Sequence, residues 1–254
     1  MTLSADAVAS DPGGYAVSGQ YYDLVSFASM RESARSALAE LVPGRRHVVE
    51  IGAGTGWFTA EIVELLETAG GDGEVSAIEP NPIMRVPLAA RLTALPVAER
   101  RATIVAGDAL ADVAGPIDLV VVLNTLGHLS PTDRAACWAH WAARAAPGAA
   151  VLVTAHRPEV ATDVAPIFMP GRRLGRHHYT AESRASVLDD ERLMWTMTYR
   201  TFPAEDPDGP PLREETVSAE AWIVPDATLD RELAVHGGTR IPGLPDGVLG
   251  WRLP

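Results

Sequence analysis

Short apolar runs alternate with segments of helical periodicity between residues 46 and 155 of this chain. Apolar residues recur at helical spacing over residues 57–69, 83–95 and 131–146, which predicts three helices. The expected strands lie at residues 47–51, 75–78, 103–106, 117–123 and 149–155. The apolar run at 117–123 is typical of a central parallel strand covered on both faces. This alternation predicts right-handed βαβ units and a doubly wound parallel sheet.

Outside this segment the pattern changes. A helix is expected at residues 28–41, and a final edge strand at residues 248–253. Ser130 and Asp226 each come at the start of an expected helix. Serine and aspartate are common N-cap residues, so both are expected to cap these helices. Within the last hundred residues, polar residues alternate with apolar or aromatic ones, which predicts an antiparallel sheet with one solvated face. Its strands are expected at residues 175–187, 192–202 and 212–224.

These patterns predict an α/β fold. We expect a Rossmann-like, doubly wound and mainly parallel sheet, with an N-terminal helical lid and a C-terminal antiparallel β extension. The whole chain, residues 1–254, is expected to form a single domain. Its expected parts are an N-terminal lid and helix (1–45), a cofactor-binding core (46–155), and a substrate-side antiparallel extension with the final strands (156–254).

Composition and charge exclude several classes of protein. All 21 basic residues are arginine, so the chain has no lysine for a Schiff base, for pyridoxal phosphate or for a P-loop. The net charge of −12 argues against nucleic acid and membrane surfaces as partners. The single cysteine, Cys137, excludes a disulfide framework. No signal peptide or spanning apolar run is visible, so we expect a cytoplasmic protein.

A glycine-rich loop at residues 52–56 is the most informative segment. It lies between an expected strand and an expected helix, where backbone N–H groups and the helix N-terminus can receive a ligand. The glycines do not fit the dinucleotide pattern G-x-G-x-x-G, because Trp57 stands where its third glycine would fall. Glu50 precedes the loop; a carboxylate there would repel a pyrophosphate but suit a cationic amino-acid group.

Residues 46–155 resemble the class I S-adenosylmethionine-dependent methyltransferases, in which an acidic residue precedes x-G-x-G-x-G. Further motifs follow in the family's order at Glu79, at Gly107-Asp108-Ala109 and at the end of the fourth strand. The resemblance implies S-adenosyl-L-methionine as cofactor and S-adenosyl-L-homocysteine as product. It implies that Glu79 binds the ribose hydroxyls and that Asp108 binds the adenine amino group. The full set of cofactor-binding residues that it implies is Tyr15, Tyr22, Glu50, Gly52, Ala53, Gly54, Gly56, Glu79, Pro80, Met84, Gly107, Asp108, Ala109 and Asn124.

Two further segments bear on the chemistry. Methyl transfer from a sulfonium is an in-line displacement, so the protein must align the reactants and exclude water. His128 is expected to act as proton acceptor, since it follows the fourth strand at the edge where ligands bind. A loop histidine bonded to backbone is the alternative. The run Tyr21-Tyr22-Asp23-Leu24 resembles an entry segment of small-molecule methyltransferases, which makes Tyr22 a second catalytic candidate beside a simple packing role.

The expected partner is a small-molecule methyl acceptor, either an amine or a hydroxyl. Residues 126–129 and the antiparallel C-terminal sheet look like those of bacterial aminosugar N,N-dimethyltransferases and their natural-product relatives. This suggests a role in secondary metabolism, with a monomeric or homodimeric protein. One alternative is a protein of this fold that binds the cofactor and catalyses a non-methylating reaction such as a cyclisation. Another is a nucleotide-linked oxidoreductase, against which the glycine spacing argues. No ligand spacing for a metal is visible.

Overall fold

The computed structural model describes residues 14–25 and 28–254, with the side chains of residues 28–30 left aside. The chain forms two compact units. One contains residues 29–159 and 224–254, and the other contains residues up to 28 together with residues 160–223. The prediction that residues 1–254 act as a single domain stays a prediction, because two units can still serve one site.

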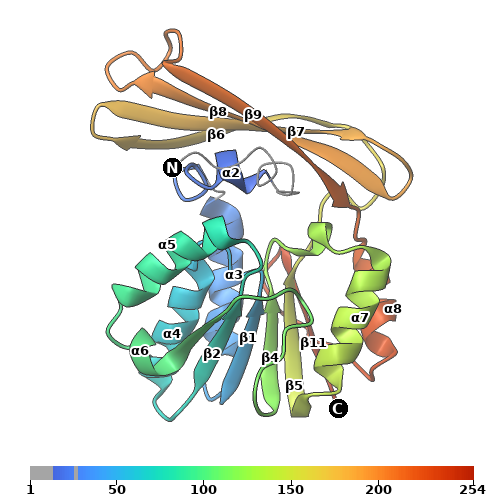
Figure 1. Cartoon of the computed structure of the whole chain (residues 1–254). Helices are drawn as coiled ribbons and strands as arrows, with labels where there is room; N and C mark the ends of the chain where they lie inside the picture. The colour runs from blue at the N-terminus through green and yellow to red at the C-terminus, as the bar shows by residue number, and fades with distance from the viewer. Residues whose placement is uncertain (1–13, 26–27) are drawn as a thin grey trace. The chain divides into compact units, whose positions relative to one another are not determined.

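The first unit is built on a seven-stranded sheet in the order β10-β11-β5-β4-β1-β2-β3 (Figure 1). The first five strands of the chain are parallel, and the last two pair antiparallel at one side. This is the mixed, mainly parallel sheet that the strand–helix alternation predicts. The strands are β1 (His47–Ile51), β2 (Glu74–Ile78), β3 (Ala102–Val105), β4 (Ile117–Val122), β5 (Ala145–Thr154), β10 (Thr239–Arg240) and β11 (Val248–Arg252).

Helices cover both faces of this sheet. Figure 1 shows α4, α5 and α6 on one side and α7 and α8 on the other. Side chains of α3, α4 and α5 share one apolar core with β1, β2, β4 and β5, which explains why the central strands are apolar on both faces. The helices are α3 (Ala28–Leu41), α4 (Trp57–Ala69), α5 (Pro82–Thr93), α6 (Ala98–Arg101), the 3₁₀ turn η1 (Leu126–His128), α7 (Pro131–Ala142) and α8 (Asp226–Ala234).

Ser130 caps α7 as predicted. Its hydroxyl accepts the backbone N–H of Asp133 (3.1 Å), and the Asp133 carboxylate accepts the backbone N–H of Ser130 (3.3 Å). The predicted end of this helix was wrong, because α7 stops at Ala142 and β5 begins at Ala145. Pro147 lies inside this strand. The irregular register between β4 and the start of β5 accommodates it, since a proline is tolerated where a ladder hydrogen bond is already missing.

Two other predictions near the C-terminus were wrong. Asp226 is the first residue of α8 and not its cap; its carboxylate pairs with Arg157 (2.9 Å) instead. Strand β11 is not at the edge, because the two-residue strand β10 pairs with its outer side. A strand of two residues is too short to show a periodic pattern, so it could not be predicted.

The second unit contains a four-stranded antiparallel sheet in sequential order, β6-β7-β8-β9, and the short helix α2 (Tyr15–Ser18). The strands are β6 (Val164–Leu174), β7 (His177–Val187), β8 (Arg192–Pro203) and β9 (Arg213–Trp222). The separate antiparallel sheet was predicted, but β6 was not, because Pro166, Pro170 and Gly171 interrupt it. Prolines confine a strand to a sheet edge, and β6 is an edge strand.

An aromatic cluster fills one face of this sheet. The rings of Tyr21 and Tyr199 stack with centroids 4.7 Å apart, and Tyr179, Met169 and Ala181 pack around them. The Tyr21 hydroxyl donates to the Glu215 carboxylate. The entry segment is thus tied to the sheet through its first tyrosine, which is buried in this core.

Candidate cofactor-binding site

The glycine loop connects β1 to α4 at the carboxyl edge of the seven-stranded sheet. The backbone N–H groups of Gly52 and Ala53 both donate to the carbonyl of Ile78, at 2.9 Å each. Ile78 is the last residue of β2, so these bonds fix the loop to the neighbouring strand. The loop is therefore held in place before any ligand arrives.

The three glycines of the loop have different surroundings. All have positive φ angles, which glycine adopts most easily. A Cβ built on Gly52 would lie 2.3 Å from the Thr125 Oγ1, and one on Gly56 would lie 2.5 Å from the Leu88 Cδ1. A Cβ on Gly54 would meet the Met84 Cε at 3.7 Å and the Gly52 carbonyl oxygen at 4.0 Å, both ordinary contacts. Gly52 and Gly56 are thus required for packing, whereas Gly54 leaves space in which a ligand can approach the backbone.

Glu79 lies directly beside this open position. Its Oε2 accepts the backbone N–H of Gly54 (2.7 Å), and its Oε1 accepts the backbone N–H of Asn81 (2.8 Å). The residue is only 5% exposed, so the carboxylate is fixed in orientation. Each carboxylate oxygen has a further lone pair, so both can still accept ribose hydroxyls. The geometry fits the predicted ribose contact, which stays a prediction.

Glu50 is buried, and its side chain turns toward α4, where the Thr59 hydroxyl donates to it. Burial raises the pKa of Glu50 to about 8, the Thr59 hydrogen bond lowers it, and the nearby Glu79 raises it further. The carboxyl is therefore protonated near pH 7 while no cation lies beside it. A cationic amino group would favour the ionised form. That Glu50 contacts the cofactor stays a prediction.

Residues after β2 and β3 complete the same edge. Met84 of α5 is buried and faces the glycine loop through its Cε, as a residue beside adenine would, whereas Pro80 is exposed. Asp108 is exposed and accepts the backbone N–H of Leu110 (2.9 Å), which fixes the turn around Gly107 and Ala109. These positions fit the cofactor contacts implied by the resemblance, which stay predictions.

Asn124 follows the end of β4 and has a φ angle of 56°. Among the described residues, every other positive φ angle belongs to a glycine. Its backbone N–H donates to the Thr154 Oγ1 (3.2 Å), which joins the ends of β4 and β5. Residues other than glycine rarely adopt this conformation, and such strain is commonly found at functional sites. Sequence spacing selected Asn124, but the strain was visible only in the structure.

Two histidines follow neighbouring strands at this edge. His128 ends η1 and is exposed, and desolvation by the surrounding protein lowers the pKa of its imidazole. The neutral form is thus favoured near pH 7, as a proton acceptor requires. His156 follows β5 and was not predicted. Burial lowers its pKa, as does the nearby charge of His128, and its Nδ1 has no partner among the described residues. Its position just after a strand end was the available signal.

Tyr15 and Tyr22 belong to the other compact unit, where both are half-buried. Tyr15 begins α2, and Tyr22 follows the stacked Tyr21 in the entry segment. Their predicted roles toward the cofactor and in catalysis stay predictions. Among the described residues, no helix is long and apolar enough to cross a membrane. Likewise, the described part of the chain holds no group of three or more side chains suited to a metal ion.

Comparison with protein families finds a match over the strands that form this edge. Residues 49–151 match a family model described as a methyltransferase domain. The match begins in β1 and ends in β5, so it contains the glycine loop, Glu79, Asp108, Asn124 and His128. No curated protein matches the chain in sequence.

Solved structures resemble the chain over nearly its whole length. CalS10, an amino pentose methyltransferase from Micromonospora echinaspora solved with S-adenosylmethionine bound, is 19% identical with a TM-score of 0.69, covering 94% of this chain and 97% of its own. KedS8, a sugar N-methyltransferase from a Streptoalloteichus species, is 18% identical with a TM-score of 0.69, and the match covers 100% of this chain and 96% of KedS8. The glycopeptide N-methyltransferase MtfA is 19% identical with a TM-score of 0.55, and the match covers 87% of this chain and 94% of MtfA. At these identities the likeness shows the fold.

Proposed function

Since residues 49–151 form a class I S-adenosylmethionine-dependent methyltransferase domain, we propose that the protein methylates an amine of a small molecule and releases S-adenosyl-L-homocysteine. The observation that supports cofactor binding most directly is the pairing of Glu79 with the open backbone at Gly54. The cofactor supplies an activated methyl group on a sulfonium. The chain's own residues bind it, orient it and receive a proton.

The cofactor-binding residues fit the parts of S-adenosyl-L-methionine by their chemistry. Glu79 offers two fixed acceptor oxygens to the ribose hydroxyls, and Met84 offers an apolar surface to the adenine. Glu50 gains from a cationic amino group, because that charge favours the ionised carboxylate. In this proposal the loop at Gly54 receives the methionine part, and Asp108 with Gly107 and Ala109 receives the adenine amino group.

An amine acceptor is favoured over a hydroxyl by two observations. The structural neighbours named above include a sugar N-methyltransferase and a glycopeptide N-methyltransferase. The chain is also strongly acidic, which suits a cationic acceptor. An aliphatic amine is protonated near neutral pH and must lose that proton before its lone pair can attack. In this proposal the neutral imidazole of His128 accepts the proton, and Tyr22 contacts the cofactor or the acceptor.

The test measures cofactor binding and methyl transfer separately. Titration calorimetry with S-adenosyl-L-homocysteine is expected to show one site. Incubation with S-adenosyl-L-methionine and a panel of aminosugars, each paired with its hydroxyl analogue, is expected to yield an acceptor whose mass rises by the ~14 Da of a methylene. The reaction products are identified by mass spectrometry. The variant Glu79→Ala, which is expected to bind the cofactor poorly, is the matched control for both measurements.

The outcomes are distinct. Absence of cofactor binding would contradict the proposal altogether. Methylation of the hydroxyl analogues alone would replace the amine with a hydroxyl acceptor. Cofactor binding with conversion of an acceptor at unchanged mass would favour the non-methylating alternative, in which the sulfonium charge assists a reaction such as a cyclisation.

A further inference from the structure

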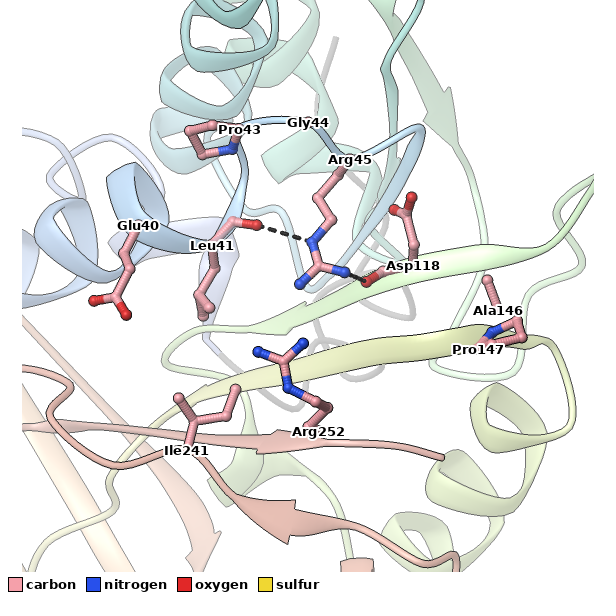
Figure 2. Close-up of a pocket in the computed structure, with 10 residues that line it drawn as sticks. All are labelled: Glu40, Leu41, Pro43, Gly44, Arg45, Asp118, Ala146, Pro147, Ile241 and Arg252. Atoms are coloured by element: carbon pink, nitrogen blue, oxygen red, sulfur yellow. Dashed lines mark hydrogen bonds between the residues drawn. The ribbon is translucent and has the colours of Figure 1, made fainter.

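A cavity of about 450 Å³ opens at the edge of the seven-stranded sheet opposite the glycine loop. Strands β4 and β5 begin at this edge, and the antiparallel β11 ends there, which brings Asp118, Pro147 and Arg252 around one space (Figure 2). The last turn of α3 and the loop after it add Leu41 and Arg45. The residues expected to bind the cofactor are not part of this lining, so a ligand here would occupy a separate site.

Two arginines lie at this cavity without a carboxylate partner. Figure 2 shows the guanidinium groups of Arg45 and Arg252 facing the same space. Arg45 donates to the carbonyls of Leu41 (3.0 Å), Asp118 (2.8 Å) and Gly148 (3.4 Å), which are uncharged acceptors. The guanidinium of Arg252 forms no hydrogen bond or ion pair with any described residue, although the backbone of Arg252 is paired in the sheet. Other arginines of this acidic chain do pair with carboxylates: Arg134 with Glu232 and Arg240 with Asp230 are examples.

The two carboxylates at the cavity form no ion pair with either arginine in the described chain. The Asp118 carboxylate accepts the backbone N–H groups of residues 46 (2.7 Å) and 47 (3.1 Å), which fix the start of β1. Glu40 is exposed and forms no ion pair with either arginine in the described chain. Burial lowers the pKa of Arg45 and Asp118 opposes this, while the like charge of Arg252 lowers it further. An anion between the two guanidinium groups would relieve that repulsion.

We propose that this cavity binds a small organic phosphate, with the phosphate group between Arg45 and Arg252 and the organic part along Leu41, Pro147 and Ile241. The guanidinium of Arg252 can bind phosphate through paired N–H groups, and Arg45 can add its Nη2, since its Nε and Nη1 already donate to carbonyls. A phosphate has enough oxygens to accept from both arginines at once, whereas a carboxylate has only two. The volume falls within the range of small-molecule sites, about 300–1,000 Å³. It therefore leaves room for more than an inorganic ion.

Binding at this place would join the end of α3, the start of β4 and the end of β11. A ligand that binds only the folded chain stabilises it in proportion to the logarithm of its concentration. The site would therefore act on the stability of this unit and not on the methyl-transfer step. Because the cavity shares no lining residue with the expected cofactor site, the two proposals can fail independently.

The test uses phenyl phosphate and inorganic phosphate as probes at constant ionic strength. Binding is followed by the NMR shifts of the arginine Nε–H groups and of the backbone amides, with the full chain. We expect saturable shifts at Arg45 and Arg252, with tighter binding of phenyl phosphate because of its apolar ring. Arg252→Gln is expected to weaken binding about tenfold. Glu40→Gln is expected to strengthen it severalfold by removing a competing negative charge. Arg172→Gln, which removes an exposed arginine of β6, is the control of equal charge and should leave binding unchanged.

Several results would overturn the proposal. These are the absence of saturable shifts at the two arginines, shifts confined to Gly54 and its neighbours, and equal binding by wild type and Arg252→Gln. If Arg252→Gln fails to fold, the opposite response of Glu40→Gln still decides the question. Equal weakening by Arg172→Gln would show a general effect of surface charge and would also refute a site at this cavity.

Discussion

The two edges of the seven-stranded sheet each carry a carboxylate that accepts two backbone N–H groups, yet the two carboxylates serve different ends. At the carboxyl edge, Glu79 accepts from Gly54 and Asn81, in a loop where the backbone at Gly54 is open. At the amino edge, Asp118 accepts from residues 46 and 47 and so holds the start of β1 against β4. The bonding is alike, but Glu79 accepts from a glycine whose surroundings are open, whereas Asp118 accepts from residues at the start of a paired strand.

This comparison shows what makes such a carboxylate a binding residue. In an open α/β sheet the ligand lies beyond the carboxyl ends of the strands, where the loops diverge and leave backbone uncovered. Glu79 lies at that edge beside open backbone, whereas the cavity beside Asp118 at the opposite edge offers the guanidinium groups of two arginines. A carboxylate bonded to backbone N–H groups therefore indicates a ligand only where the adjoining backbone remains accessible.

The largest effect is expected for Gly54→Val. A branched side chain would occupy the open space beside Glu79, so binding of S-adenosyl-L-homocysteine should fall below detection in calorimetry. Gly115→Val is the matched control, because Gly115 also has a positive φ angle (80°) and open surroundings but lies just before β4, at the opposite edge. Both variants should lose similar stability from backbone strain, about 1–2 kcal/mol. Near-normal cofactor affinity of Gly54→Val would disprove the assignment of the loop.

The second prediction separates the two carboxylates directly. Glu79→Ala should weaken cofactor binding at least tenfold, because one lost charge-assisted hydrogen bond is worth about 1.5–3 kcal/mol. Asp118→Ala should lower the free energy of unfolding by about as much and leave cofactor affinity unchanged. The two dissociation constants and two urea unfolding curves test this. Equal affinities in the two variants would show that the edges do not differ as described.

The third prediction concerns pH and Glu50. Because the pKa in the folded state is about 8 and the ordinary value is 4.5, the unfolded chain loses this proton first as pH rises. The ionisation of Glu50 therefore has no effect on the free energy of unfolding below about pH 4.5. Between there and about pH 8 it lowers that free energy increasingly. Relative to wild type, Glu50→Gln should gain about 1.4 kcal/mol of unfolding free energy per pH unit across that window. Parallel stability curves for the two proteins, measured without cofactor, would contradict the raised pKa.

The smallest effect is expected for His128→Ala. With an amine acceptor, water can take the proton at high pH, so turnover should fall less than about tenfold near pH 9 and more at pH 6. Cofactor affinity should barely change, since the imidazole is expected to face the acceptor. His236→Ala, a histidine between α8 and β10, is the control. A loss of turnover of about 10²–10⁴-fold at all pH values would instead indicate a hydroxyl acceptor. Weakened cofactor binding would show that His128 faces the cofactor and not the acceptor.

Much of the fold could be predicted because its signals are local. Apolar runs and helical periodicity gave α3 and α4 at the bounds observed, and gave β1 as well. The capping box at Ser130 is a relation between neighbours in the chain. By contrast, β6 has prolines that are tolerated only at a sheet edge, and the sequence does not say where the edge lies. The same holds for β11, whose neighbours are set by pairing with β5 and β10.

Residue type and spacing were enough to select the candidates for the cofactor site: a glycine loop, acidic residues at strand ends and a histidine after β4, all in the order of a known family. How these residues differ from one another became visible only in the folded chain. Folding left Gly54 open while Thr125 and Leu88 enclose the other two glycines. It buried both acidic residues but gave them different partners: Glu50 accepts from the Thr59 hydroxyl, and Glu79 accepts from the backbone of the loop. It also brought Arg45 and Arg252, far apart in the chain, to one cavity. The physical reason is that motifs depend on residue type and spacing, whereas burial, free space and pKa depend on which distant segments pack against each residue.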